Sequence, residues 1–187
     1  ALAPASFGEE RTRARNEIVR AADAFLALYE HEGYHIPFAP GPGPSYPWGS
    51  NSFILNNAIV LALAVDVTQD KKYLAAVTGT MDYLLGENPL DQSYITGYGV
   101  RPLKNPHHRF FARQLRKDRP EPPPGIVSGG PNTGLQDPFA RGAGLQGKPP
   151  QKCFLDHIES YSTNEITINW NAPLAWVASF LDDLASR

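Results

Sequence analysis

The stretch from Phe53 to Val67 constrains the fold most, because it would form a helix that is apolar on nearly every side. Only two asparagines and one aspartate interrupt it. Such a helix is stable in water when other elements cover it on several sides. It is also too short to cross a bilayer. We therefore predict a buried core helix, capped at its start by Ser50 or Ser52, in an all-α protein.

Three further helices are predicted from apolar spacing and end signals. Residues 9–31 carry one apolar stripe behind a charged first half, as expected of a surface helix. Residues 70–85 carry one apolar face and are followed by Gly86, a residue type favoured just past helix ends. The fourth helix covers residues 169–184, where we expect Pro173 to be tolerated only in the first turn.

A long segment without helical or strand periodicity, residues 87–164, separates the third predicted helix from the fourth. It has 78 residues and holds eleven of the eighteen prolines. Ordered loops of this length are usually functional. Four helices and one loop make a poor closed core around residues 53–67. We therefore expect residues 1–187 to be part of a larger domain.

Charge and cysteine content exclude several classes of function. Seventeen basic and nineteen acidic residues leave a net charge of −2, without a long run of one sign. This pattern disfavours nucleic acid and membrane surfaces as partners. The single cysteine, Cys153, excludes an internal disulfide framework and a four-thiolate zinc site. The first ten residues have no basic region followed by an apolar region, so they are not an intact secretory signal.

The first chemistry-bearing cluster runs from Ser93 to Arg109 and reads SYITGYGVRPLKNPHHR. Tyrosine, imidazole and guanidinium side chains together suit a sugar site, where hydroxyls need directional partners and ring faces need aromatics. A solvated loop or a zinc-ligand pair are the alternatives. Because adjacent side chains of an extended segment point to opposite sides, His107 and His108 are a poor pair of ligands for one ion.

The second cluster, Phe154 to Ala172, places three carboxylates near aromatic residues. They are Asp156, Glu159 and Glu165. A carboxyl group among apolar rings has a raised pKa, which suits a general acid. From composition alone, Glu165 is as readily a carboxylate that stabilises a helix start as a catalyst.

These two clusters resemble the two signatures of glycoside hydrolase family 9, the inverting cellulases. The first pattern is carried by Ser93, Ile95, Thr96, Gly99, Arg101, Pro106, His107 and Arg109, and the second by Phe154, Asp156, Tyr161, Glu165, Thr167, Asn171 and Ala172. The flanking runs YPWGSNS, YLLGENP and GGPN are also similar to the family. The resemblance covers about residues 10–185.

The resemblance implies part of an (α/α)6 barrel with long active-site loops, and a catalytic set of Glu165, Asp156 and His107. Glu165 would be the general acid that protonates the leaving glycosidic oxygen. Asp156 falls on the family's second marked carboxylate, and we expect it to support the site rather than act as the base. The implied reaction is hydrolysis of β-1,4-glucosidic bonds in cellulose or a related β-glucan, with inversion.

Four residues are expected to contact the glucan substrate by the same resemblance. His107 and Arg109 would hydrogen-bond the sugars on either side of the cleaved bond. Tyr161 would line the site. Trp48 is a candidate platform on which a sugar ring stacks. Alternatively, Trp48 is a buried packing residue of the inner helix ring.

The catalytic base of the family comes from an Asp-x-x-Asp motif in the N-terminal half of the barrel, and this sequence has no such motif. We therefore expect a complementary N-terminal part of the same catalytic domain as partner, and an inactive isolated chain. The alternatives are a carbohydrate-binding fragment without catalysis, an exo-acting member such as a cellobiohydrolase, β-glucosidase or exo-glucosaminidase, and a helical interaction domain.

No cofactor is required for this chemistry. The family often binds calcium, and residues 132–137 are a polar stretch that would supply oxygen ligands to a structural ion. By the same resemblance we expect the protein to be extracellular.

Overall fold

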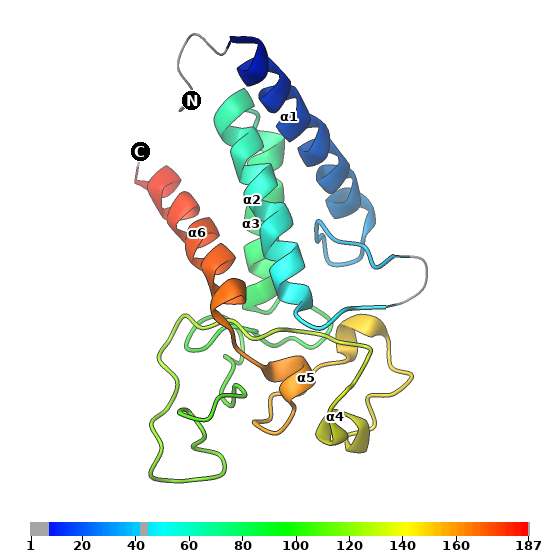
Figure 1. The fold of residues 1–187 in the computed structure, drawn as a ribbon, viewed down its shortest axis with the longest axis vertical. Coiled ribbons are helices and arrows are strands. Elements are labelled where there is room, and N and C mark those ends of the chain that lie inside the picture. Colours follow the sequence, from blue (N-terminus) through cyan, green and yellow to red (C-terminus); the bar gives the residue numbers. More distant parts are fainter. Residues whose placement is uncertain (1–7, 42–44, 187) are drawn as a thin grey trace.

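The computed structural model describes residues 8–41 and 45–186. Four long helices gather at one end of the molecule, and residues 87–164 form the other end (Figure 1). The long helices are α1 (Gly8–His31), α2 (Ser50–Thr68), α3 (Lys71–Leu85) and α6 (Ile168–Ala185). Short helical segments occur at α4 (Pro138–Gly142), Pro150–Lys152 and α5 (Tyr161–Asn164). The described residues contain isolated β-bridges and no strand.

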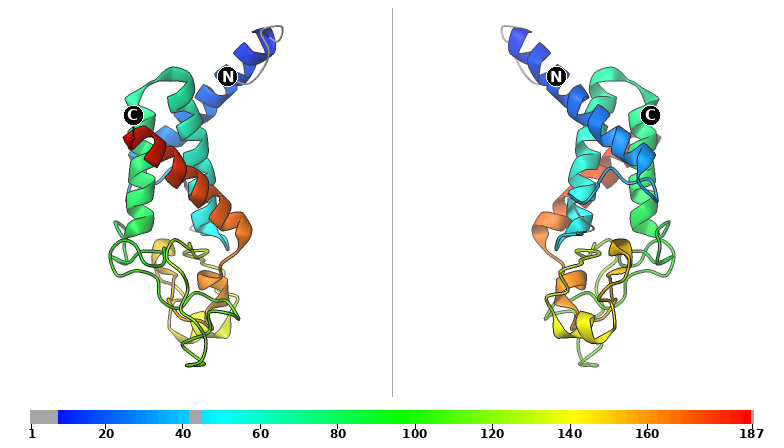
Figure 2. Two further views of the ribbon diagram at one scale, coloured as in Figure 1. Left: turned by 90° about the vertical axis from the view of Figure 1, so that its left-hand side faces the viewer. Right: turned by 90° about the vertical axis from the view of Figure 1, so that its right-hand side faces the viewer.

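Helix α2 is the centre of the helical end, because it packs against α1, α3 and α6. Its side chains Ile54, Leu55 and Leu61 are fully buried. Views from two sides show the same separation of the long helices from the loops below them (Figure 2). The prediction of a buried core helix is therefore confirmed.

Helix α2 is longer than the apolar run predicts. Its 19 residues are long and apolar enough, by length and composition, to cross a membrane. Ten of them are buried within this fold, however, including three polar residues at its start. That burial identifies α2 as the core helix of a packed domain.

The start of α2 differs from the prediction of a serine cap. The N-cap residue is Gly49, which has a left-handed backbone with φ of 81° and offers no side-chain cap. Ser50 lies inside the helix and donates its hydroxyl to the Pro131 carbonyl at 2.7 Å. The Ser52 hydroxyl turns back to the Gly49 carbonyl at 2.8 Å. Both serines are thus used in other contacts, one of them to the loop end.

Helix α3 ends as predicted, whereas α6 does not fit the expectation for its proline. Gly86 closes α3 with φ of 132° and donates its N–H to the Tyr83 carbonyl at 3.3 Å. Pro173 lies inside α6, beyond the first turn, because the helix already begins at Ile168. The carbonyl that loses its intrahelical donor belongs to Asn169, which is exposed, so water can replace the lost partner.

A short segment around Gly129 joins the helical end to the loop end. The Asn51 backbone N–H donates to the Gly129 carbonyl at 2.9 Å, and the Asn51 side-chain amide donates to the Ser128 carbonyl at 3.0 Å. The Trp170 indole lies against both Gly49 and Gly129, where a Cβ atom would come within 2.8 Å of the ring. Close approach of these backbones therefore depends on the absence of side chains.

Candidate active site

Glu165 lies just before the last long helix, between α5 and α6. Its backbone is extended, with φ of −63° and ψ of 148°, so α5 ends and the chain turns towards α6. The Glu165 carbonyl accepts the Gly129 N–H at 2.8 Å. The side chain is half-buried, and none of the described residues donates a hydrogen bond to its carboxylate. The backbone of Glu165 is thus fixed while its carboxyl group is available to a ligand.

His107 lies beside Glu165. The two residues form a parallel β-bridge, and the His107 N–H donates to the Asn164 carbonyl at 2.8 Å. The Nδ1 atom of the ring bonds to the Ile158 carbonyl. Because a carbonyl only accepts, Nδ1 carries the proton, and Nε2 is the nitrogen left for another partner.

Two further aromatic rings continue from His107. The Tyr161 ring centroid is 5.7 Å from that of His107 and 5.8 Å from that of Trp48. The Tyr161 hydroxyl donates to the Gln136 carbonyl at 3.3 Å. All three rings are half-buried. Such a row offers flat apolar faces and polar edges, which suit the faces and hydroxyls of sugar rings.

Asp156 organises the backbone that leads to His107. Its two oxygens accept the backbone N–H groups of Lys104 at 2.9 Å and Asn105 at 2.8 Å. The side-chain amides of Gln92 and Asn164 donate to the same carboxylate at 3.3 and 3.4 Å. A carboxylate that accepts four hydrogen bonds is engaged in holding the loop.

Arg109 is not joined to this group by any hydrogen bond or ion pair among the described residues. It is exposed, as is His108, whose Nδ1 accepts the Phe110 N–H at 3.2 Å. The structure therefore brings together His107, Tyr161, Trp48, Glu165 and Asp156, and it leaves Arg109 at the solvent-facing edge.

Two residues that position the site were missed by sequence reasoning. The fully buried Asn164 side chain donates to the Asn105 carbonyl and to the Asp156 carboxylate, so it ties the loop before His107 to α5. The fully buried Asp137 caps α4 through the Ala140 N–H at 2.6 Å and accepts the Ser162 N–H at 3.1 Å. The contacts that tie separate segments together, from Asn164 to the Asn105 carbonyl and from the Ser162 N–H to Asp137, join groups distant in sequence, so no local pattern reveals them.

The stretch 132–137, from which the resemblance suggests calcium ligands, has its Asn132 and Asp137 side-chain oxygens hydrogen-bonded within the protein. The Asn132 side-chain oxygen accepts the Gly134 N–H at 2.9 Å. Both Asp137 oxygens accept hydrogen bonds, including two from serine hydroxyls. A calcium ion in this stretch stays a prediction. Among the described residues there is also no cluster of three or more His, Cys, Asp or Glu suited to a metal ion.

Comparison with known proteins identifies relatives along nearly the whole chain. The profile described as Glycosyl hydrolase family 9 matches residues 4–178. The chain is 54% identical over 174 residues to a cellulose 1,4-beta-cellobiosidase of Acetivibrio thermocellus. The aligned residues make up 92% of this chain and 19% of that protein. It is 42% identical over 166 residues to a cellodextrinase of Butyrivibrio fibrisolvens, covering 89% of this chain and 29% of that protein.

Solved structures share the fold. The structure of AaCel9A in complex with cellobiose-like isofagomine matches with a TM-score of 0.77 and 38% identity, over 92% of this chain and 32% of that one. The structure titled Bacteroides ovatus GH9 matches with a TM-score of 0.80 and 30% identity, over 99% of this chain and 31% of that one. These matches confirm the expected helical part of an (α/α)6 fold. The chain spans less than a third of the length of each relative described.

Proposed function

Because this chain belongs to glycosyl hydrolase family 9, we propose that it supplies the acid-bearing part of an active site that hydrolyses β-1,4-glucosidic bonds with inversion. The observation that carries this proposal is the position of Glu165. Its carboxylate has no hydrogen-bond donor among the described residues, and its backbone is paired with that of His107. A free carboxyl group beside an aromatic row suits proton transfer to a glycosidic oxygen.

In the proposed reaction, Glu165 donates its proton to the leaving oxygen. His107 binds a sugar hydroxyl through Nε2, because its Nδ1 is already committed to the Ile158 carbonyl. Tyr161 and Trp48 offer ring faces to the glucan. Arg109, which is exposed, reaches a neighbouring sugar when substrate binds. Asp156 holds the loop in place and takes no proton.

The water-activating base belongs, in this proposal, to a complementary N-terminal part of the catalytic domain. An inverting enzyme separates its two carboxyl groups by about 6.5 to 9.5 Å, to leave room for the attacking water. We propose that residues 1–187 alone do not hydrolyse glucan, and that the complete enzyme acts outside the cell, where cellulose is found.

The decisive experiment compares the isolated chain, the complementary part and their mixture on soluble cellulose. NMR then follows the anomer that is released first. Activity only in the mixture, with an inverted anomer, is the expected result. Full activity of residues 1–187 alone, or a retained anomer, would refute the proposal.

A carbohydrate-binding fragment without catalysis is the second candidate, since the Asp-x-x-Asp motif is missing from this sequence. This second candidate predicts that the mixture of residues 1–187 with the complementary part binds cello-oligosaccharides and produces no reducing ends. The relatives include a cellobiosidase of Acetivibrio thermocellus and an endoglucanase C of Cellulomonas fimi, so exo action remains a candidate beside endo action.

A further inference from the structure

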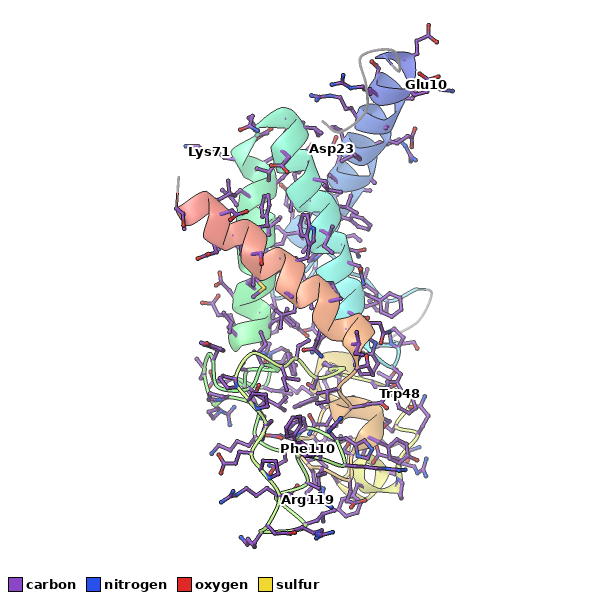
Figure 3. All side chains as sticks on the ribbon, turned by 60° about the vertical axis from the view of Figure 1, so that its left-hand side comes forward. Glu10, Asp23, Trp48, Lys71, Phe110 and Arg119 are labelled. Atoms are coloured by element: carbon purple, nitrogen blue, oxygen red, sulfur yellow. The ribbon has the colours of Figure 1, made fainter. Side chains whose placement is uncertain are left out.

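Residues 109–119 concentrate positive charge in a chain whose net charge is −2. The segment has five basic residues and one acidic residue. Figure 3 labels Phe110 and Arg119 from this segment, at the end of the molecule opposite Glu10 and Lys71. Arg116 pairs with Asp118 at 2.7 Å and Arg113 with Glu121 at 3.3 Å, so part of the charge is compensated locally.

A hollow of about 800 Å³ lies next to this segment. Its walls carry three basic side chains, those of Lys104, Arg113 and Lys117, and one acidic side chain, that of Glu121. Glu121 is already paired with Arg113, whereas no described residue forms an ion pair with Lys104 or Lys117. The remaining wall residues are Thr96, Gly97, Pro102, Leu103, Asn105, Gln114, Pro122 and Pro124.

The hollow shares a wall with the candidate active site. Lys104 and Asn105 line it, and their backbone N–H groups donate to the Asp156 carboxylate. A second connection comes from Gln114, whose side-chain oxygen accepts the Ile158 N–H at 2.9 Å. The Ile158 carbonyl in turn bonds to His107. A ligand in the hollow therefore lies close to the loop that carries His107.

We propose that this hollow is a subsite for carboxylate groups carried by a substituted glucan chain. Lys104 and Lys117 attract the carboxylate, and the rings of Pro102, Pro122 and Pro124 pack against the apolar face of the sugar that bears it. The inference rests on the proposed function, because the ligand is a carboxylate-bearing member of the same class of glucan substrates. Overall charge does not explain such a preference, since a chain with net charge −2 repels a polyanion on average.

The experiment measures binding of the complete enzyme to carboxymethylcellulose and to neutral hydroxyethylcellulose. All proteins carry Glu165→Gln, so the polymers stay intact. The parent is compared with Lys104→Gln/Lys117→Gln and with Lys71→Gln/Lys148→Gln. The control pair removes the same charge from exposed lysines outside the hollow. We expect the parent to bind the carboxymethyl polymer about fivefold more tightly at low salt, and we expect this preference to fall below twofold at 0.3 M salt.

The subsite variant should lose the preference at low salt while keeping its affinity for the neutral polymer, and the control variant should behave like the parent. Glucuronic acid should compete with the carboxymethyl polymer more strongly than inorganic phosphate does. A preference that survives Lys104→Gln/Lys117→Gln, or stronger competition by phosphate, would overturn the subsite alone. Failure of the parent to bind either polymer would overturn both the subsite and the proposed function.

Discussion

The backbones of His107 and Glu165 pair as a parallel β-bridge, although one residue lies in a long loop and the other between two helices. The hydrogen bond from the His107 N–H to the Asn164 carbonyl, at 2.8 Å, fixes the register of the pair. Any shift of the loop therefore moves the imidazole relative to the carboxyl group. The position of the loop and the relative placement of these two side chains are therefore coupled through this contact.

The activities of this and the next two sets of variants are measured in the complete enzyme, because the isolated chain is expected to be inactive. There, Glu165→Gln should remove most activity on unactivated glucan and leave binding nearly unchanged. The substitution keeps the size of the side chain and removes the transferable proton, so we expect a rate loss of about 10² to 10⁴. Steady-state kinetics on cello-oligosaccharides, with binding measured by calorimetry, test this. Glu159→Gln is the matched control, because Glu159 is a nearby half-buried carboxylate outside the bridge. A wild-type rate for Glu165→Gln would contradict the assignment of Glu165 as the general acid.

His107→Ala and Arg109→Ala should each weaken productive binding without unfolding the protein. Loss of a donor to a sugar oxygen costs about 0.5 to 3 kcal/mol. We expect kcat/KM to fall in both variants, while His108→Ala, an exposed neighbour, stays near the parent. Kinetics and thermal melting on the same samples check this prediction. A large drop in Tm at unchanged kcat/KM would point to a purely structural role.

Asp156→Ala should reduce both stability and activity. The change leaves the Lys104 and Asn105 N–H groups without their acceptor, which costs about 1 to 3 kcal/mol. Activity should fall as the His107 loop shifts, yet the pH at which activity rises should stay where it is, because Asp156 transfers no proton. Urea unfolding and a pH profile measure the two effects. Asp182→Ala, an exposed aspartate of α6, should change neither; a displaced pH profile for Asp156→Ala would contradict the supporting role.

Gly130→Ala should destabilise the junction between the helices and the loops by at least about 2 kcal/mol. Gly130 has φ of 89°, and an added Cβ would come within 2.4 Å of the buried Asn51 side chain. Left-handed backbone and overpacking are both unfavourable for alanine. Gly142→Ala has open space around it and should change stability by less than about 1 kcal/mol. Equal melting temperatures of the two variants would show that the junction tolerates a side chain.

Alkaline pH should destabilise the fold partly through Tyr46. Burial raises the pKa of Tyr46 from 10.0 to about 12, and the hydrogen bond from Gln151 acts in the opposite direction. Because the folded-state pKa is the higher one, the stabilisation is complete below pH 10 and is lost as the pH rises towards 12. Between pH 9 and 11.5, we expect the free energy of unfolding of Tyr46→Phe to fall by about 2 kcal/mol less than that of the parent. Urea unfolding at these pH values tests the prediction. Tyr34→Phe, which changes a half-exposed tyrosine, is the control. The same pH dependence of the unfolding free energy in Tyr46→Phe and the parent would refute the role of Tyr46.

The four long helices were predictable from the sequence to within a few residues, because each buries an apolar stripe or surface that recurs with the helical period. The short helices α4 and α5 were not. Helix α4 has a local cap, from Asp137 to the Ala140 N–H, but its five residues are too few to show a helical period. Helix α5 is held by hydrogen bonds to residues far away in sequence. The identity of the site residues came from motif resemblance, whereas the aromatic row and the bridge to Glu165 required coordinates. The periodic spacing of apolar residues shows which face of a helix is buried. It carries no information about which loop segments pair through their backbones.

The three tryptophans of this chain occupy three different environments, which makes them intrinsic optical reporters. Trp170, buried between Gly49 and Gly129, senses whether the helical end and the loop end remain docked. Trp48, half-buried beside Tyr161, would report ligand arrival at the proposed sugar site. Trp176, which is 38% exposed and stacked on Phe180, should respond first to soluble quenchers. Single-tryptophan variants would therefore separate ligand arrival from loosening of the domain by fluorescence alone.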